Sequence, residues 1–493
     1  MNPAAAGDSS LNPDDVIVIV KLSSGFSGPG VGVGDGPGVV EVVVVLGEGA
    51  EEPPVQAAVD RSAASSNAHT HRHAARAPCR LPVPQALSGT VTDAGSIGVK
   101  PSSLTRYRKK LSTAVVGLLL ACAPSGAAGQ EPSGWQWRGD ANVFLVYNHQ
   151  DRRFVDFTAW ESQNWFMLAG DGPVGRGRVS VTGMISLEPF TLDALGSPQA
   201  FQTGESYHGS ALIDYQHPHD LLMNLGASYR VERGAWSYVV GADLVGTAAL
   251  GPPPFMHRDS ARDNPQTPLG HHQLDATHAT PGVVRGGIGY REWQAEASWF
   301  RGREPDDKRI AIDRPWLDSW SARIGWRRGS WQAQVSGGHL TRPEAVDPFD
   351  ETRLTASIGF NGRIGSRATA VTAAWGQNRE VHGDLNALLL EWNTAPWRSG
   401  SVYGRGEIAQ KDLLGATVPR DREHQHIPSR IGALTLGYLH DLIERRWGRI
   451  GVGGDATLYR TSADLRALYG GPRAFHLFLR YRPAADASMG HVH

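Results

Sequence analysis

From about residue 138 onward, very short connections alternate with much longer ones, and both join segments of roughly ten residues. This rhythm is typical of a closed transmembrane β-barrel. Short turns of outer-membrane barrels face the periplasm and long loops face outward, so the pattern also predicts the orientation. The tight connections are expected at 171–175, 232–234, 290–292, 327–330, 362–365, 395–398 and 444–446, and the long ones at 189–218, 247–281, 302–316, 341–351, 378–385, 411–429 and 460–472.

Apolar and polar side chains alternate within these segments. Trp236, Tyr238 and Val240 alternate with Ser237 and Gly241, and residues 292–301, 331–340 and 352–362 repeat the pattern. A charged side chain that faces lipid at mid-depth costs up to about 4 kcal/mol, so the polar faces are predicted to point into the lumen. The lumen-lining candidates either line a channel or pair across a closed lumen; they are Glu296, Arg353, Glu391, Arg405 and Glu407.

The predicted fold is all-β: a transmembrane, antiparallel, up-and-down β-barrel over residues 129–483. The count is about 16 strands, held to within two (14–18), and an even number places both ends of the barrel on the periplasmic side. The strands are expected near 140–148, 161–169, 176–188, 219–231, 235–246, 282–290, 292–301, 317–327, 331–340, 352–362, 366–377, 386–394, 400–410, 430–440, 448–459 and 473–482.

Tryptophan positions agree with two membrane interfaces, where amphipathic rings gather. One set lies beside the tight turns: Trp236, Trp293, Trp326, Trp331, Trp397 and Trp447. A second set is expected to form the opposite girdle near the long loops: Trp165, Trp299, Trp320 and Trp375. A soluble β-sandwich is the alternative interpretation of these residues.

The segment before the barrel carries an export signal. Basic residues from Arg106 to Lys110 precede the apolar run Leu111 to Ala123, which is too short to span a bilayer. A signal peptide is therefore predicted at 105–128, with cleavage after Ala128; lipidation at Cys122 is the alternative. Residues 1–104, rich in Gly, Pro, Ala and Val, are expected to be disordered or to reflect a mis-assigned start codon, and 484–493 to be a flexible tail.

The composition argues against a disulfide-rich fold and against nucleic-acid binding. Cys79 and Cys122 are the only two cysteines, and both precede the expected barrel, which excludes a disulfide framework there. The formal net charge of -1 gives no basic excess of the kind that nucleic-acid-binding domains show.

The long loops hold clusters of histidine and carboxylate. Imidazole and carboxylate together suit zinc, copper or nickel, so these residues are metal-ligand candidates. The alternative is that the same residues hydrogen-bond a loop that folds against the barrel wall. If the orientation is right, they cluster at the outer mouth or fold into the lumen. The candidates are His217, His219, Asp220, His257, His271, His272, Asp275 and His278.

Covalent catalysis is a third hypothesis, since some outer-membrane barrels are hydrolases. Ser260, His257 and Asp259 are neighbours in sequence, but a triad is defined by mutual orientation. No Gly-x-Ser-x-Gly elbow occurs in a strand-to-helix context. The chain is accordingly predicted not to be an enzyme.

Several loop motifs resemble those of a family of uncharacterised bacterial outer-membrane β-barrel proteins, over approximately residues 140 to 340. The resemblance implies a barrel and supplies neither a biochemical role nor functional residues. The matching motifs are Leu187-Glu188-Pro189-Phe190-Thr191, Gln202-Thr203-Gly204-Glu205, His217-Pro218-His219-Asp220, Phe255-Met256-His257-Arg258, Gly270-His271-His272 and Phe300-Arg301-Gly302-Arg303-Glu304-Pro305-Asp306.

These observations predict a porin-like channel for small polar solutes in the bacterial outer membrane, since a barrel of this strand number encloses more space than its own side chains fill. Binding of copper or zinc by the histidine-rich loops is the alternative function. The expected partners are membrane lipid, the barrel-insertion machinery and a small polar solute or metal ion, without nucleic acid. Assembly as a homotrimer is left open.

Overall fold

The computed structural model describes residues 18–22, 40–44, 134–153, 155–204, 206–413 and 428–484. The chain divides into two compact units, Met1–Ile97 and Gly98–His493. In the first, β1 (Val18–Leu22) pairs antiparallel with β2 (Val40–Val44). The predicted signal peptide and nearly all of the predicted tail lie outside the described residues. Among those described, no helix is both long and apolar enough to cross a membrane.

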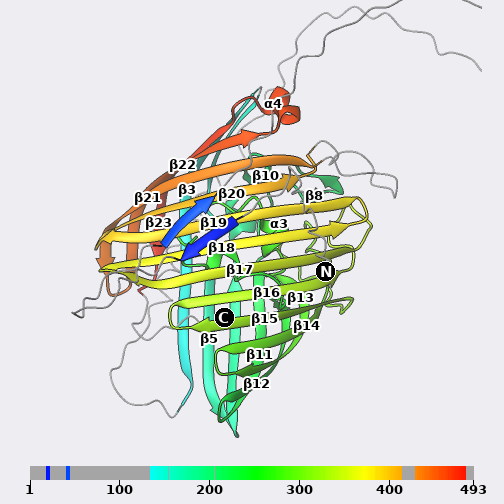
Figure 1. The fold of residues 1–493 in the computed structure, drawn as a ribbon, viewed down its shortest axis with the longest axis vertical. Helices are drawn as coiled ribbons and strands as arrows, with labels where there is room; N and C mark the ends of the chain where they lie inside the picture. The colour runs from blue at the N-terminus through cyan, green and yellow to red at the C-terminus, as the bar shows by residue number, and fades with distance from the viewer. Residues whose placement is uncertain are drawn as a thin grey trace, which may run out of the picture. The chain divides into compact units, whose positions relative to one another are not determined.

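The second unit is a closed antiparallel β-barrel in which neighbouring wall strands follow one another along the chain (Figure 1). β3 pairs with β4 over residues 146–152 and with β5 over residues 136–143, so β4 and β5 occupy one wall position end to end. Sixteen positions result, which confirms the predicted fold and count. The strands are β3 (Gln136–Arg152), β4 (Val155–Glu161), β5 (Asn164–Val174), β6 (Gly177–Ile185), β11 (Leu222–Arg233), β12 (Trp236–Gly246), β13 (Thr280–Tyr290), β14 (Trp293–Phe300), β15 (Ser319–Arg328), β16 (Trp331–Leu340), β17 (Glu351–Ile364), β18 (Arg367–Glu380), β19 (Gly383–Trp397), β20 (Gly400–Lys411), β21 (Ser429–Arg445), β22 (Gly448–Thr461) and β23 (Arg473–Arg482).

Closure joins the two ends of the chain's barrel region. β23 pairs with β3, in the register Tyr481 to Val143. The first wall strand, β3, begins and the last, β23, ends on the same side of the barrel. We call this side the turn side, because the seven tight turns lie there. Gln136 pairs with Asp171 on this side, and Arg482 pairs with Arg449. An even number of wall positions produces this arrangement, as predicted.

All seven tight turns are present, but one long connection was predicted wrongly. Residues 378–385, expected to form a loop, instead complete β18 and β19, and only Val381 and His382 connect the strands. The segment near 149–160 is likewise mostly strand, in β3 and β4. Both errors have one cause: strand ends that project beyond the bilayer have no lipid-facing side, so their side chains lose the alternation that marks a membrane strand.

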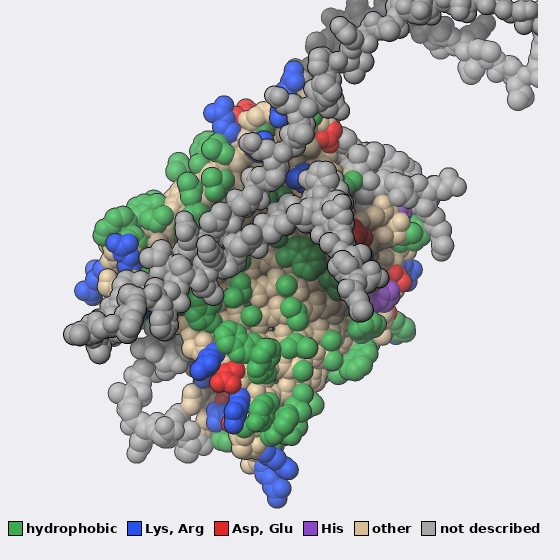
Figure 2. All heavy atoms as spheres, viewed as in Figure 1, with side chains coloured by type: hydrophobic (Ala, Val, Ile, Leu, Met, Phe, Trp, Pro, Cys, Tyr) green, Lys and Arg blue, Asp and Glu red, His purple; other side chains and the backbone are tan. Residues whose placement is uncertain are grey.

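The outward-facing side chains form an apolar belt. Val240, Trp299, Val335 and Ile358 are exposed, whereas inward neighbours such as Ser298 are buried. Figure 2 shows hydrophobic side chains spread over the near face of the molecule, with most charged side chains toward its margins. The alternation therefore has the predicted sense, with hydrocarbon in contact with the apolar side.

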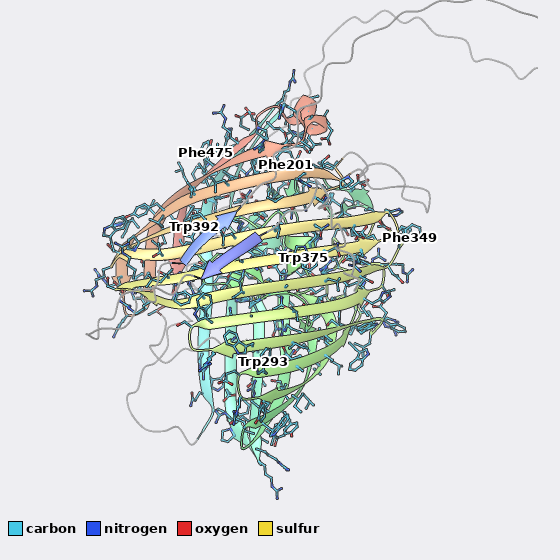
Figure 3. All side chains as sticks on the ribbon, viewed as in Figure 1. Phe201, Trp293, Phe349, Trp375, Trp392 and Phe475 are labelled. Atoms are coloured by element: carbon cyan, nitrogen blue, oxygen red, sulfur yellow. The ribbon has the colours of Figure 1, made fainter. Side chains whose placement is uncertain are left out.

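The tryptophan prediction holds for most residues. Trp293 pairs with Trp326 at the turn side, and Trp299 pairs with Trp320 near the loops. Figure 3 labels Trp293 near the end of its strand. The prediction is wrong for Trp165, because its side chain is buried, packs with Met184 and Met223, and lines an internal cavity.

Short elements belong to the loops rather than to the wall. The loop between β6 and β11 contains two small antiparallel pairs, and the loop between β12 and β13 contains a helical turn on each side of its midpoint. They are α2 (Glu188–Thr191), β7 (Ser197–Pro198), β8 (Ser206–Tyr207), β9 (Ser210–Ala211), β10 (Tyr215–Gln216), η1 (Phe255–His257), α3 (His271–Leu274) and, between β22 and β23, α4 (Ala463–Tyr469).

Candidate functional site

The loop between β12 and β13, residues 247–279 and hereafter the inner loop, fills much of the lumen. Leu250, Leu269 and Leu274 in it are almost fully buried. Its helix α3 contacts β17, β18 and β19. Gly376 on β18 permits this approach, because an added Cβ would lie only 2.1 Å from the backbone oxygen of Gln273. The loop is therefore an internal element, which is the second of the two arrangements that the sequence left open, the outer mouth or the lumen.

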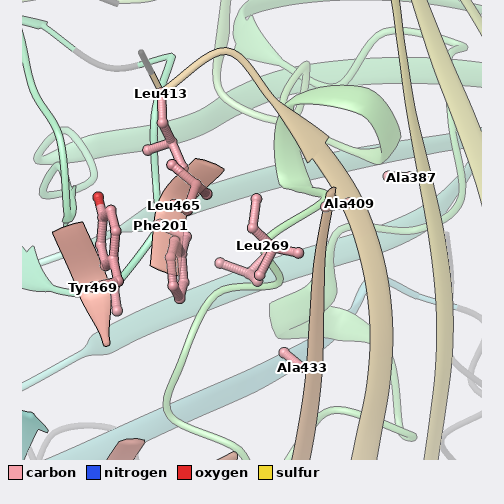
Figure 4. Packing of buried hydrophobic residues seen from close by; sticks show 10 residues of the cluster. Phe201, Leu269, Ala387, Ala409, Leu413, Ala433, Leu465 and Tyr469 are labelled. Atoms are coloured by element: carbon pink, nitrogen blue, oxygen red, sulfur yellow. The ribbon is translucent and has the colours of Figure 1, made fainter. Parts of the chain in front are cut away.

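An apolar cluster joins the inner loop to three other parts of the barrel unit. Figure 4 shows Leu269 beside Ala409, with Phe201 and Tyr469 nearby. The rings of Phe201 and Tyr469 stack with centroids 4.3 Å apart. Leu465 of α4 belongs to the same cluster. Two long loops and α4 thus share one core on the loop side of the lumen.

Arg258 holds the middle of the inner loop to the wall. Its Nε donates to Oε2 of Glu391 at 2.7 Å, and its Nη1 donates to Asp275. Arg405 donates from Nε to the other oxygen of Glu391 at 3.0 Å. Burial alone would lower the pKa of Arg258, but Glu391 and Asp275 together raise it. The guanidinium therefore remains charged inside the lumen.

Asp263 makes a second attachment. It accepts hydrogen bonds from Ser401 at 2.6 Å and Asn393 at 2.8 Å, and it forms an ion pair with Arg480. Burial opposes ionisation, but the positive charge of Arg480 and these donors keep the pKa of Asp263 below its ordinary value. Strands β19, β20 and β23 thus bind one carboxylate of the inner loop.

Four of the five lumen-lining candidates form ion pairs, and the fifth, Glu407, accepts backbone hydrogen bonds. Glu391 and Arg405 belong to the Arg258 network. Glu407 accepts the backbone N–H of Leu269 at 2.6 Å. Arg353 pairs with Glu351 at 2.9 Å. Glu296 pairs at 2.8 Å with Arg323, which donates onward to the backbone oxygen of Gly251.

Three metal-ligand candidates lie together in the lumen. The ring centroid of His278 is 5.3 Å from that of His219 and 5.2 Å from that of His271. Each imidazole uses its Nδ1: His219 bonds Glu188 at 2.8 Å, His271 bonds Asp275 at 2.7 Å, and His278 bonds the backbone oxygen of Asp275 at 2.9 Å.

The other candidates occupy different surroundings. His272 lies 3.2 Å from Glu304, and Asp220 pairs with Arg309 at 3.3 Å. The ring of His257 is 4.8 Å from that of Trp165, and His217 lines a cavity. Within the described ranges, no group of three or more His, Cys, Asp or Glu side chains is arranged to hold a metal ion.

Burial and neighbouring charges shift the pKa values of His219 and His278 in opposite directions. Burial disfavours the charged form of His219, but the Glu188 carboxylate raises the pKa of His219 above its ordinary value. Burial and the neighbouring His271 and His219 lower the pKa of His278 well below its ordinary value, although Asp275 opposes the shift. The pKa values of these two adjacent imidazoles are therefore shifted in opposite directions.

Among the hydrolase candidates, Ser260 forms hydrogen bonds with residues of the barrel wall. The hydroxyl of Ser260 lies 2.7 Å from that of Thr372 and donates to Glu391 at 3.3 Å. The side chain of Ser260 thus contributes to the attachment that Arg258 makes.

Two adjacent cavities remain between the inner loop and the first strands of the barrel. The cavity nearer the long loops is called the upper cavity. Its volume is about 50 Å³, and its lining includes Asn142, Gln163 and Gln266. The lower cavity, about 100 Å³, opens toward the turn side beside Arg138 and Asp171. Trp165, Met256 and Arg262 line both, so these three side chains form the partition between them.

The residues that define these cavities were not predicted from the sequence. Trp165 was expected in a membrane girdle, and Asn142, Gln163 and Gln266 were not among the candidate residues. One signal was present: amide side chains and a tryptophan occur close together in the first two predicted strands. Gln266 could not have been added, because only the folded loop brings it there.

No protein-family model matches the chain, and a search of curated proteins finds no match. Among solved structures, the chain is similar to an anion-selective porin from Comamonas acidovorans (12% identity, 71% of this chain and 99% of that chain, TM-score 0.42). It is also similar to OprB of Pseudomonas putida (8%, 71% and 94%, 0.44) and to OmpT, an outer membrane protein of Vibrio cholerae (9%, 72% and 100%, 0.39).

Proposed function

We propose that this protein is a non-enzymatic outer-membrane channel for small polar solutes, with its route between the inner loop and strands β3, β5 and β6. The observation that supports it is the pair of adjacent cavities, which share Trp165, Met256 and Arg262. On β17, β18 and β19 the wall is instead in direct contact with α3 of the inner loop. A solute would therefore pass along one side of the lumen.

The partition determines how much the channel conducts. Met256 is half-buried and unbranched, and Met side chains adapt easily to a passing molecule. Trp165 is large and packed against Met184 and Met223, so it forms the fixed side. Displacing Met256 would join the two cavities without breaking an ion pair.

Single-channel recording in planar bilayers tests the proposal. The unmodified chain is expected to give small conductance steps, and Met256→Gly to give steps about twofold larger or more. Trp320→Gly, on the lipid-facing side of β15, is the control and should leave the steps unchanged. Absence of conductance in both the unmodified chain and Met256→Gly would contradict the proposal.

The other two hypotheses have their own tests. Equilibrium dialysis with copper and zinc, compared with a variant in which His219, His271 and His278 are replaced by Ala, would reveal a metal-handling barrel. Ester hydrolysis in detergent by the unmodified chain, lost in Ser260→Ala, would reveal a hydrolase. Either result would replace the channel as the main function.

A further inference from the structure

The loop between β14 and β15, residues 301–318 and hereafter the rim loop, exposes large apolar side chains although it lies outside the wall strands. Their exposed fractions are similar to those of the apolar belt. Exposed apolar surface of this kind marks a site of interaction with another surface. The side chains are Ile310 (60% exposed), Ile312 (51%), Trp316 (59%) and Leu317 (52%).

The rim loop is held in place by contacts at several points. The backbone N–H of Leu221 donates to the backbone oxygen of Arg309 at 2.7 Å, and the side chain of Arg309 pairs with Asp220 at 3.3 Å. Within the loop, Arg301 pairs with Asp313 at 3.0 Å. The apolar side chains are therefore exposed in the folded form of the loop.

The rim loop also meets the lipid-facing part of the wall. A Cβ added to Gly282 of β13 would lie 2.7 Å from the Cβ of Pro315, and Gly282 is two positions before the exposed Val284. At the base of the loop, Trp299 of β14 pairs with Trp320 of β15, and their side chains are 54% and 52% exposed. The apolar belt thus continues from the strands into the rim loop.

From this continuity we infer that the rim loop lies on the lipid surface of the leaflet at the loop side, with its apolar side chains in the interfacial layer. Tryptophan suits that layer, because its ring is largely apolar and its N–H is a donor. The guanidinium of Arg314 lies 5.7 Å from the centre of the Trp316 ring. Such a side chain keeps its stem on apolar surface and its charge among the headgroup phosphates. This contact does not depend on the proposed channel.

Spin labelling of the full chain in phosphatidylcholine vesicles tests the inference. In a background where Cys79 and Cys122 are replaced by Ser, Ile312→Cys carries a single nitroxide. Oxygen concentrates in lipid and a charged nickel chelate stays in water, so the two collision rates identify the surroundings of the label. The label at position 312 is expected to collide more often with oxygen than with nickel.

Two further labels calibrate this measurement. Val335→Cys, at a 56% exposed position of the belt, is the lipid control, and Val381→Cys, at a 47% exposed position in the connection beyond β18, is the water control. A label at position 312 that is as accessible to nickel as the one at 381 would overturn the inference. Low accessibility to both reagents, with magnetic broadening between labels on different chains, would mean that a second copy covers the loop and would also overturn it.

A charge placed in the rim loop tests the same contact in another way. Trp316→Glu puts a carboxylate where lipid is expected, so the nickel collision rate at position 312 should rise about twofold or more. Trp397→Glu, at a 61% exposed position on the turn side, is the matched control and should leave that rate unchanged. An unchanged rate in both variants, or an equal rise in both, would contradict the inference.

Discussion

On the side of the lumen formed by β17 to β20, the inner loop packs directly on the wall, whereas on the side formed by β3, β5 and β6 two cavities separate the loop from the wall. The difference begins in the residue types. The packed side has Gly376, Ala374 and Ala387, which let α3 approach, and the paired charges of Arg258 and Glu391. Small side chains and compensated charges leave no room for solute.

The cavity side has the opposite composition. Trp165 and Met256 are large and pack in the same apolar cluster. They leave the two cavities beside them unfilled. Asn142 reaches the inner loop through one hydrogen bond to the backbone of Arg262. The same loop therefore packs against one side of the barrel wall and leaves two cavities on the other.

The largest effect is expected from Arg258→Ala, which breaks the packed side. The side chains of Arg258 and Glu391 are 2% and 1% exposed, and removing one partner leaves the other charge buried and unpaired. The free energy of unfolding should fall by about 3 to 5 kcal/mol. Equilibrium urea unfolding in lipid vesicles measures this change, and the single-channel conductance should rise in the same variant.

Arg178→Ala is the control for that prediction. Arg178 pairs with Asp171 on the cavity side, with side chains 46% and 27% exposed. Pairs this exposed contribute about 1 kcal/mol or less. If the two variants lost equal stability, the proposed difference between the two sides would be wrong.

A smaller effect is expected from Gly376→Ala. The new methyl group would lie 2.1 Å from the backbone of Gln273, so α3 must move away from β18. Overpacking of this kind costs about 1 to 3 kcal/mol, and we expect a matching loss of stability in urea titrations. In Gly183→Ala on β6, the added Cβ meets no atom within 4 Å, so stability should not fall. A destabilised Gly183→Ala with a stable Gly376→Ala would reverse the comparison.

The wall could be predicted from the sequence because each membrane strand is a local pattern. Period-two alternation needs only neighbouring residues, as in Trp236 to Val240, and the bilayer imposes it on every strand. Strand ends outside the bilayer lack that constraint, which explains the error at 378–385. Trp165 shows a related limit: an aromatic residue near a strand end suits either an interface or a lumen, and composition does not distinguish them.

The interior could be predicted only in kind. The histidines and carboxylates of the inner loop were expected either to bind metal or to hydrogen-bond the loop to the wall. The contact between Leu269 and Glu407 is of the second kind, whereas His271 bonds Asp275 within the loop itself. The wall partners lie more than a hundred residues away in the sequence, as Glu407 does from Leu269 and Glu391 from Arg258. No local pattern specifies such pairs, because they depend on how the loop returns across the lumen.

The smallest effect concerns pH and the contact between Asp220, just before β11, and Arg309, in the loop between β14 and β15. Burial raises the pKa of Asp220 to about 6, although Arg309, 3.3 Å away, opposes the shift. The ordinary value is 3.8, so between these values the folded chain binds more protons at Asp220 than the unfolded chain. The contribution of Asp220 to stability is therefore fully present below pH 4 and is lost as pH rises through about 6.

Asp220→Asn isolates this contribution, since other carboxylates also titrate in the same range. Urea unfolding at pH 4, 5, 6 and 7 should show the unmodified chain losing about 1 kcal/mol more than Asp220→Asn across the window, because solvent near the loop surface reduces the full effect of the shift. An opposite slope, with the unmodified chain gaining stability relative to Asp220→Asn as pH rises, would mean that the Arg309 ion pair outweighs burial.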